Sequence, residues 1–411
     1  CPLTMTYAAI PALRHSPELA AVWEPRITSQ HYDPRVLPAA DKRGCTLGMG
    51  MTEKQGGSDV RSNTTTAVAQ PDGSYTLVGH KWFLSAPMCD AWLVLAQAPA
   101  GITCFLLPKI RDDGRRNRIH IQRLKDKLGD RSNASSEVEF QNAVGWRVGD
   151  EGRGVRTILE MVALTRLDCM VASAGLMRQA TVQAIHHCRQ RSAFGRPLIA
   201  QPLMQNVLHD LVIENDGHLA LAMRVAQAVD QGANDPVQAA FARIATALGK
   251  YWICRRAPAV VNEAQECLGG AGYVEESLLP RLYRQAPLNS IWEGSGNVQC
   301  LDVLRALSRA PETRDVLFAE LLSVQGADTD LDREIAALPR LFDEMASLEV
   351  RSRHVVERVA LALEAACLLR MNHASATAFI RSRIAREHGL ALGTLPAEWV
   401  SVQAIEASFA V

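Results

Sequence analysis

The pattern of apolar residues changes once along this chain, near residue 154, and the change limits the folds that the chain can adopt. Before that point short strand-like segments, such as residues 91–96 and 101–107, are separated by turn residues. After it apolar residues recur every three to four positions from Val155 onward, which predicts a helix continuing to about Arg189. We therefore predict the α+β class, with a β domain of roughly 100 residues ahead of a bundle of long helices.

The same pattern divides the chain into four predicted domains. They are the remnant of an N-terminal helical domain at 1–43, a middle β domain at 44–152, a helical bundle at 153–310 and a helical extension at 311–411. Further helices are predicted from about Pro202 to Asp230, from Asp235-Pro236 to Gly269 and after Asn297. Because the chain lacks an initiator Met, we expect its N-terminal domain to be truncated.

The charge and cysteine content of the chain argue against a nucleic-acid-binding, membrane or zinc-binding protein. The 411 residues carry 44 Lys and Arg against 44 Asp and Glu, so the chain as a whole has no strong attraction to nucleic acid or an anionic membrane. No apolar run approaches the roughly 18 residues that a membrane span needs. The ten cysteines are scattered, without a Cys-x-x-Cys pair or zinc-ligand spacing. We therefore expect buried, reduced thiols, no metal site and a cytoplasmic protein.

Residues 49–58 end a strand-like segment in a string of hydroxyls and glycines. Such a string exposes groups that suit a phosphorylated cofactor, although a surface turn with a glycine pair would have the same composition. Residues 81–85 (Lys-Trp-Phe-Leu-Ser) place an aromatic ring and a hydroxyl two positions apart, hence on one side of a strand. On its own, an aromatic pair in a strand more often belongs to a core.

One carboxylate, Glu293, stands out in the string Ser-Ile-Trp-Glu-Gly-Ser-Gly-Asn at 290–297. Burial beside Trp292 would disfavour its charged form and suit it to act as a general base near neutral pH. The Gly-Ser-Gly turn that follows offers backbone amides to an anionic oxygen or a cofactor, and Asn297 is placed to cap the next helix. The alternative is an ordinary carboxylate at a helix N-terminus.

These strings together resemble the acyl-CoA dehydrogenase family. That family has T-E-x-x-x-G-S-D and then G-x-K-x-[WF]-[IL]-[ST]; this sequence has Thr-Glu-Lys-Gln-Gly-Gly-Ser-Asp at 52–59 and Gly-His-Lys-Trp-Phe-Leu-Ser at 79–85. The resemblance implies a bound FAD, an acyl-CoA substrate, a barrel-type middle domain and a homo-oligomer, expected to be a tetramer. It also implies that Glu293 removes a proton from the carbon alpha to the thioester while hydride leaves the beta carbon for the flavin.

The resemblance assigns roles to residues around the flavin. By the match, Thr52 and Ser85 hydrogen-bond the polar edge of the isoalloxazine and Phe83 flanks the ring. By the same match, Ser58 lies near the substrate and the phosphate side of the cofactor. The other cofactor contacts that it implies are Met49, Gly50, Met51, Leu84, Gly270, Ile291, Trp292, Gly294, Ser295 and Asn297.

Two strings in the helical half are similar to family elements as well. The string at 191–195 fits R-x-x-F-G, which implies that Arg191 reaches the flavin pyrophosphate of a neighbouring subunit and that Phe194 packs on its adenine. A solvated arginine at a helix end is the alternative. The string at 265–272 resembles Q-x-x-G-G-x-G, except that Glu266 stands where the family usually has Gln. A carboxylate near a pyrophosphate is unfavourable.

The position of the base differs within the family. Some members carry it on the long helix, immediately before an arginine. Here Thr165 precedes Arg166 and cannot act as a base. This favours Glu293 and leaves Arg166 as a structural or substrate-side residue.

The strings at 51–60, 125–135 and 288–297 are most similar to the alkylation-response, AidB-like branch of the family. That branch implies a C-terminal extension that binds double-stranded DNA. Two arginine clusters could form one basic stripe if their helices pack side by side: Arg351, Arg353 and Arg358, and Arg381, Arg383 and Arg386. Solvated helix faces are the alternative, because residues 301–411 carry twelve Arg, no Lys and a larger number of Asp and Glu.

The sequence therefore predicts an FAD flavoprotein that dehydrogenates a short or branched acyl-CoA, with Glu293 as the base, linked to the response to DNA alkylation. The competing prediction is a DNA-associated protective protein in which the flavin is structural and catalysis is slight. Neither prediction names the electron acceptor.

Overall fold

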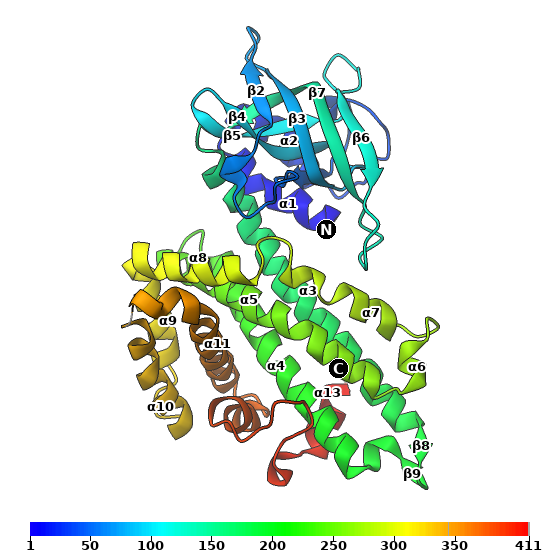
Figure 1. Ribbon diagram of the computed structural model, residues 1–411, viewed down its shortest axis with the longest axis vertical. Helices are drawn as coiled ribbons and strands as arrows, with labels where there is room; N and C mark the ends of the chain where they lie inside the picture. Colours follow the sequence, from blue (N-terminus) through cyan, green and yellow to red (C-terminus); the bar gives the residue numbers. More distant parts are fainter. Residues whose placement is uncertain (344, 410–411) are drawn as a thin grey trace. The chain divides into compact units, whose positions relative to one another are not determined.

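The computed structural model describes residues 1–343 and 345–409, which form two compact units (Figure 1). The first unit, Cys1–Thr165, holds the β-sheet, and the second, Arg166–Val411, is almost wholly helical. The prediction of an α+β chain with strands ahead of long helices is confirmed. None of the described helices is both long enough and apolar enough to cross a membrane.

The sheet of the first unit closes into a barrel. Its strands are β1 (Leu47–Gly50), β2 (Thr66–Ala69), β3 (Tyr75–Ser85), β4 (Ala91–Ala98), β5 (Gly101–Pro108), β6 (Ile119–Leu124) and β7 (Ser135–Val148). Hydrogen bonds run round the ring β4-β2-β3-β7-β5 and back to β4, with β1 added beside β4 and β6 beside β7. Closure pairs the strands of the ring on both sides and encloses an apolar interior that includes Leu77, Leu93 and Phe105.

Two short helices precede the barrel, α1 (Pro2–Leu13) and α2 (Pro17–Ile27). Each begins with a proline in its first turn, where the missing N–H has no intrahelical partner to lose. The Thr6 hydroxyl of α1 accepts a hydrogen bond from the Leu47 N–H at 2.9 Å and so ties the helix to β1. The apolar patches in this part of the sequence are therefore helical, as predicted.

The long helices begin close to where the sequence predicted them. They are α3 (Gly154–Gln190), α4 (Pro202–Gln231), α5 (Pro236–Glu266) and α8 (Gly296–Arg309), with the short α6 (Gly270–Tyr273) and α7 (Leu279–Gln285) between the last two. The carboxylate of Asp235 caps α5 by accepting hydrogen bonds from the N–H groups of Val237 and Gln238.

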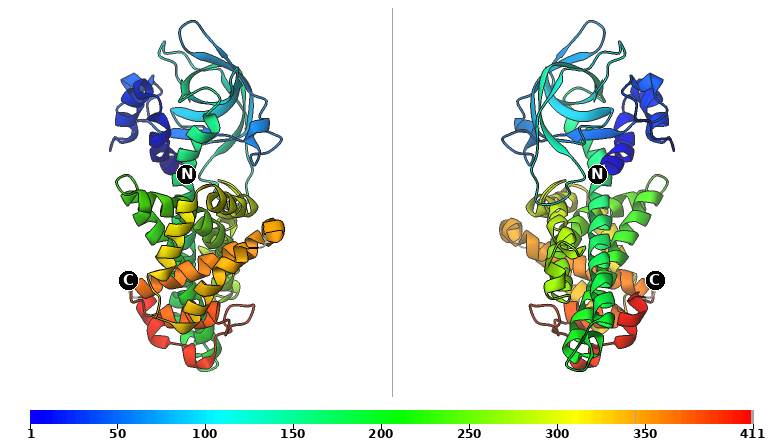
Figure 2. Two further views of the ribbon diagram at one scale, coloured as in Figure 1. Left: turned by 90° about the vertical axis from the view of Figure 1, so that its left-hand side faces the viewer. Right: turned by 90° about the vertical axis from the view of Figure 1, so that its right-hand side faces the viewer.

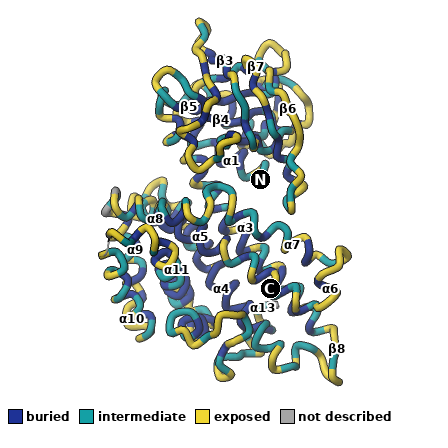
Figure 3. The backbone as a smooth tube through the Cα atoms, in the orientation of Figure 1, coloured by how far each residue is buried: buried dark blue, intermediate teal, exposed yellow. Residues whose placement is uncertain are grey.

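The remaining helices share the hydrophobic core of α3, α4 and α5. They are α9 (Pro311–Leu322), α10 (Thr329–Ala337), α11 (Met345–Arg370), α12 (Ala376–Phe379) and α13 (Val402–Phe409). Helix α11 packs against α4 and α5 (Figure 2). All three helices contribute buried residues to one hydrophobic core (Figure 3). Gly217 of α4 lies so close to the Phe379 ring that a methyl group there would come within 2.5 Å of it.

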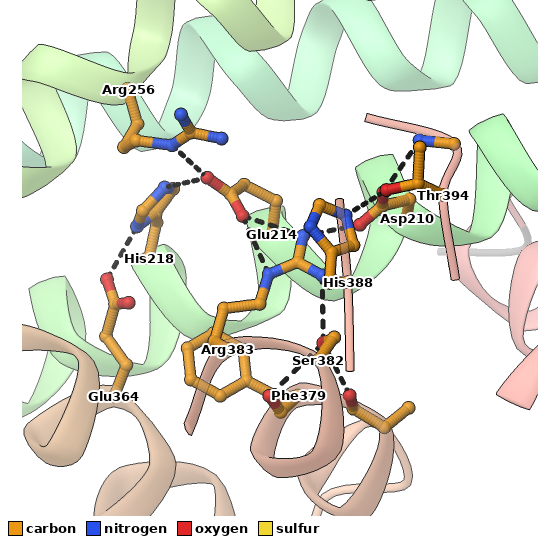
Figure 4. Close-up of polar contacts among 12 residues, drawn as sticks. Asp210, Glu214, His218, Arg256, Glu364, Phe379, Ser382, Arg383, His388 and Thr394 are labelled. Atoms are coloured by element: carbon orange, nitrogen blue, oxygen red, sulfur yellow. Dashed lines mark hydrogen bonds and ion pairs between the residues drawn. The ribbon is translucent and has the colours of Figure 1, made fainter. Parts of the chain in front are cut away.

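A buried polar network joins α4 to residues near the C-terminus (Figure 4). The guanidinium of Arg383 donates to the carboxylates of both Asp210 and Glu214, the latter at 2.8 Å. Asp210 also accepts from His388 at 2.7 Å, and Glu214 accepts from Arg256. Because a buried charge without a partner is costly, this network holds the segment after α12 in place.

The network corrects the prediction of a basic stripe. Arg383 is wrong as a DNA contact, because its side chain is only 7 % exposed and two carboxylates neutralise it. Arg381 is paired with Asp330, and Arg358 with Glu334 at 2.6 Å. Of the predicted set, Arg353 and Arg386 are exposed, while Arg351 is half-buried and donates to the Ser347 hydroxyl at 2.7 Å.

All ten cysteines are free thiols, and nine of them are buried. Burial raises the pKa of Cys104 to about 12, so this thiol stays protonated at neutral pH. Among the described residues no group of three His, Cys, Asp or Glu side chains is arranged to hold a metal ion.

The imidazole of His218 makes the stability of the second unit dependent on pH. Burial alone would lower the pKa of His218, but the carboxylates of Glu364, at 2.6 Å, and Glu214, at 3.4 Å, raise it to about 9. The raised pKa stabilises the fold fully below about pH 6.5 and less as pH rises through 9. We expect the free energy of urea unfolding to be about 1–3 kcal/mol lower at pH 9.5 than at pH 6.

The matched control for this prediction is the exposed His354 of α11. His218→Gln should lower stability at pH 6 and flatten the pH dependence, whereas His354→Gln should leave both unchanged. An equal slope in wild type and His218→Gln would contradict the prediction.

Candidate functional site

In the first unit the predicted cofactor string begins with a tight turn after β1. The Gly56 N–H donates to the Glu53 carbonyl at 3.0 Å, and the positive φ of Gly56, +118°, favours glycine there. A methyl group added to Gly57 would lie 2.4 Å from the Thr52 hydroxyl oxygen. Gly57 is therefore needed for the Thr52 side chain to keep its position. Ser58 is exposed beyond the turn.

A fully buried ion pair fastens this turn to β3. The Lys81 ammonium lies 2.7 Å from the Glu53 carboxylate, and neither side chain has any exposed surface. Glu53 also accepts from the N–H groups of Thr64 and Thr65, while Lys81 donates to the Leu95 carbonyl at 2.7 Å. Both charges are thus matched by an opposite charge and by backbone groups.

The pair stays ionised at neutral pH. Burial would raise the pKa of Glu53, but Lys81 and the surrounding donors lower it to about 2. Burial lowers the pKa of Lys81 to about 8, and Glu53 limits the fall. The attraction between the two charges therefore persists around pH 7.

The strand segment at 82–85 lies directly against Thr52. The Trp82 N–H donates to the Thr52 carbonyl at 2.9 Å. A β-bulge between Lys81 and Leu84 explains why these two side chains, three residues apart, both point inward. Phe83 is left 43 % exposed and Ser85 half-buried, whereas Leu84 is 1 % exposed. Leu84 can reach a cofactor only through its backbone.

The three predicted contacts ahead of Thr52 form the end of β1. Met49 and Gly50 are buried, and Met51 is half-buried. A methyl group on Gly50 would come within 2.6 Å of Leu84, so glycine allows β1 and β3 to approach closely here. These residues shape the strand that leads into the Thr52 turn.

In the second unit the candidate base, Glu293, has a left-handed backbone with φ of +55°. It lies in the loop between the turn at Leu288–Ser290 and α8. For a residue that carries a Cβ, this conformation costs about 1 kcal/mol or more of free energy, so the surrounding structure has to impose it. Such residues are concentrated at functional sites.

Three side chains hold the loop by its carbonyl groups. The Lys250 ammonium donates to the carbonyls of residues 292 and 294, at 2.7 and 2.6 Å. Arg166 donates to the carbonyl of residue 293 at 2.9 Å. Gln299 donates to the carbonyls of residues 293 and 294, at 3.0 and 3.1 Å. Three consecutive carbonyls around the carboxylate are therefore hydrogen-bonded to side chains.

Arg166 was predicted as a structural or substrate-side residue, and in the structure it has a structural contact. Besides the carbonyl of Glu293, it contacts the Asp302 carboxylate at 2.9 Å. Arg243 contacts the same carboxylate at 2.7 Å. A contact between Arg166 and substrate stays a prediction.

The two residues before Glu293 differ in exposure. Ile291 is 62 % exposed, and the half-buried Trp292 donates from its indole N–H to Asn289 at 2.9 Å.

The prediction that Asn297 caps the next helix is wrong. Helix α8 already begins at Gly296, and the Asn297 side chain accepts from Arg353 at 2.8 Å.

The predicted pyrophosphate elements are on the surface of the second unit. Residues 192–197 form a hairpin of β8 (Ser192–Ala193) and β9 (Arg196–Pro197), with Phe194 97 % exposed at its tip. Arg191 is exposed at its base, and Gly270 is exposed where α6 begins.

Three family models match the chain. The acyl-CoA dehydrogenase C-terminal domain matches residues 152–308, the acyl-CoA dehydrogenase middle domain matches 48–143, and the N-terminal domain of adaptive response protein AidB matches 1–34. The chain belongs to the acyl-CoA dehydrogenase family. Within that family it is AidB-like, as the sequence predicted.

Individual relatives agree with this family. The AidB protein of Escherichia coli (strain K12) is 52 % identical over 339 residues, which cover 82 % of this chain and 62 % of that protein. Acyl-CoA dehydrogenase family member 11 of Caenorhabditis elegans is 35 % identical over 323 residues, covering 75 % of this chain and 52 % of that protein. The chain therefore spans between half and two thirds of the length of these curated relatives.

Solved structures confirm the fold of an acyl-CoA dehydrogenase. The structure of Caenorhabditis elegans ACDH-11 in complex with C11-CoA has a TM-score of 0.83 and 28 % identity, covering 99 % of this chain and 74 % of that one. The apo-form of Bd2924 has a TM-score of 0.81 and 30 % identity, covering 90 % of this chain and 75 % of that one.

The sequence analysis did not identify four residues that hold the Thr52 turn and the Glu293 loop in place: Glu53, Lys81, Lys250 and Gln299. Glu53 and Lys81 stand inside the family strings, yet only the fold brings them together. Lys250 had a local signal, because it is the one charged residue in the otherwise apolar or uncharged stretch 244–254 of α5. A lone charge at helical spacing from core residues indicates a buried partner.

Removing one member of the buried pair should destabilise the first unit strongly. Glu53→Gln leaves the Lys81 ammonium buried without an opposite charge, and we expect the free energy of unfolding to fall by about 3–5 kcal/mol. Calorimetry or urea unfolding would measure the loss. As a control, Arg131→Gln breaks the exposed pair with Asp126 and should cost at most about 1 kcal/mol. Equal small losses in both variants would refute the importance of the buried pair.

Proposed function

We propose that this chain is part of an FAD-dependent oxidoreductase that dehydrogenates an acyl-CoA between its alpha and beta carbons, with Glu293 as the base. The observation that carries the proposal is the left-handed backbone of Glu293, imposed by donors to three consecutive carbonyls. A carboxylate held in this way is pre-organised to take a proton from one position. The family membership of the chain supports the reaction class.

The first unit has residues that suit the flavin ring. The hydroxyls of Thr52 and Ser85 belong to half-buried residues of adjoining segments, and Phe83 offers an exposed ring beside them. A flavin needs hydrogen-bond partners at its polar edge and an apolar surface against its face. We propose that these residues bind it. The cofactor, when bound, would accept the hydride from the substrate's beta carbon.

The exposed hairpin of the second unit suits contact with another molecule. Phe194 is 97 % exposed at the tip of this hairpin, and its backbone has a φ of +52°, which costs free energy for a residue that carries a Cβ. We propose that Phe194 and Arg191 contact the adenine and pyrophosphate of a flavin bound mainly by another copy of the protein, which makes the protein a homo-oligomer. Gly270 would lie near the same pyrophosphate.

The names of relatives support an acyl-CoA substrate. One solved relative is a complex with C11-CoA, and other relatives are named isovaleryl-CoA dehydrogenase and short-chain acyl-CoA dehydrogenase. We propose a short or branched acyl-CoA for this chain. The backbone amides of the turn after Glu293 would donate to the thioester oxygen and so stabilise the charge that develops as the alpha proton leaves.

Glu293→Gln should abolish the reaction without removing the cofactor. We expect acyl-CoA to bleach the visible flavin absorbance of the wild type under anaerobic conditions, and to do so at least about a hundredfold more slowly in the variant. The matched control is Glu312→Gln, which removes an exposed carboxylate from the first turn of α9. Bleaching of Glu293→Gln at the wild-type rate would show that another group is the base.

The AidB-like sequence supports a second candidate, a DNA-associated protein of the alkylation response with a structural flavin. After the correction of the arginine stripe, Arg353 and Arg386 remain exposed for contact with phosphates. If this candidate is right, Arg353→Ala with Arg386→Ala should weaken retention on double-stranded DNA and reduce its salt dependence. Unchanged retention would remove the arginine basis of this candidate.

A further inference from the structure

We propose that Lys250 is the positioning residue of the Glu293 base: its buried ammonium holds the two peptide groups that flank Glu293 and thereby sets the direction of the carboxylate. The inference rests on the proposed function in one respect, because it takes Glu293 to be the base. The effect of Lys250 on the loop is a property of the chain itself.

Lys250 is buried, and its ammonium meets backbone carbonyls. It lies in the middle of α5 and is 1 % exposed. Its ammonium donates to the carbonyl of Trp292 at 2.7 Å and to that of Gly294 at 2.6 Å. Both acceptors belong to one loop, and they are separated by a single residue, Glu293.

Convergence of these two carbonyls on one nitrogen bends the backbone between them. In an extended chain the carbonyls of residues i and i+2 point the same way but lie nearly 7 Å apart, too far to share one ammonium. The left-handed φ of Glu293, +55°, and that of Gly294, +92°, supply the necessary bend. The hydrogen bonds of Lys250 thus offset the strain at Glu293.

Gln299 and Arg166 complete the support from other elements. A methyl group on Gly294 would come within 2.7 Å of the Gln299 amide nitrogen, so a glycine is needed for Gln299 to reach the loop. Arg166 holds the remaining carbonyl, and its second contact is with Asp302. Among the residues that the structure describes, Lys250 is the one seen to bind the carbonyls on both sides of Glu293.

The charge of Lys250 adds an electrostatic effect on the same loop. Burial lowers the pKa of Lys250; the nearby Cys169, Cys254 and Glu293 oppose this, and Arg166 adds to it. The ammonium and the Glu293 carboxylate therefore stabilise one another's charged forms. Replacing Lys250 by a neutral residue should change both the mobility of the loop and the pH dependence of proton removal.

The experiment compares wild type with Lys250→Met, which replaces the side chain by an unbranched one that is one atom shorter and has no donors. Amide hydrogen exchange in residues 290–296 should accelerate at least about tenfold in the variant. Flavin reduction by saturating acyl-CoA should slow about 10–100-fold, while FAD content and the Kd for acyl-CoA change less than about twofold. The pH at which the rate is half-maximal should also move upward, because a neighbouring positive charge is lost.

Arg243→Met is the matched control, since it removes a cation two turns earlier on α5 that contacts Asp302 but not the loop. It should leave exchange, rate and pH profile unchanged. Exchange and reduction rates within twofold of wild type in Lys250→Met would overturn the inference. A variant that reduces flavin slowly with an unchanged loop and pH profile would overturn it too, because general destabilisation would explain that result.

If Lys250→Met does not fold, Lys250→Gln retains a shorter donor and provides the same readouts. Failure of both variants to fold counts against a specific positioning role. The exchange measurement separates the inference from the proposed function. Wild type that never reduces flavin with acyl-CoA would refute the function, while accelerated exchange in Lys250→Met would still support the role of Lys250 in the loop.

Discussion

A charged side chain that is buried has to meet an opposite charge or polar backbone groups, and both units of this protein are organised around that requirement. In the first unit Glu53 and Lys81 meet inside the barrel. In the second, Lys250 meets backbone carbonyls, and Arg383 meets two carboxylates of α4. Each arrangement joins segments that are distant in sequence, so the partner of each charge determines where a loop or strand lies.

These buried charges act on the backbone of the functional segments. Glu53 and Lys81 set the turn that carries Thr52 against the strand that carries Phe83 and Ser85. Lys250 binds the carbonyls of the peptide groups on either side of Glu293. The backbone geometry of both segments therefore depends on a few interior residues.

The arginines after residue 311 show that clusters of basic residues along a sequence do not establish a basic surface. In the sequence they suggested a surface for DNA, yet Arg383, Arg381 and Arg358 each neutralise a carboxylate of the same unit. The carboxylate in such a pair cancels much of the attraction between the arginine and a phosphate. The C-terminal helices share the core of the long helices, and Arg383 attaches the segment after α12 to α4.

Local patterns in the sequence determined the order of strands and helices, the start of α5 at its Asp235 cap and the family strings around Thr52, Phe83 and Glu293. Those features depend on neighbours within a few residues, and periodicity and spacing record them directly. Only the tertiary structure decided which buried charges pair, that Asn297 lies inside a helix, that a bulge turns Leu84 inward, and that Glu293 has a left-handed backbone. The physical reason is that burial and ion pairing join residues such as Lys250 and Trp292, or Asp210 and Arg383, that are far apart along the chain.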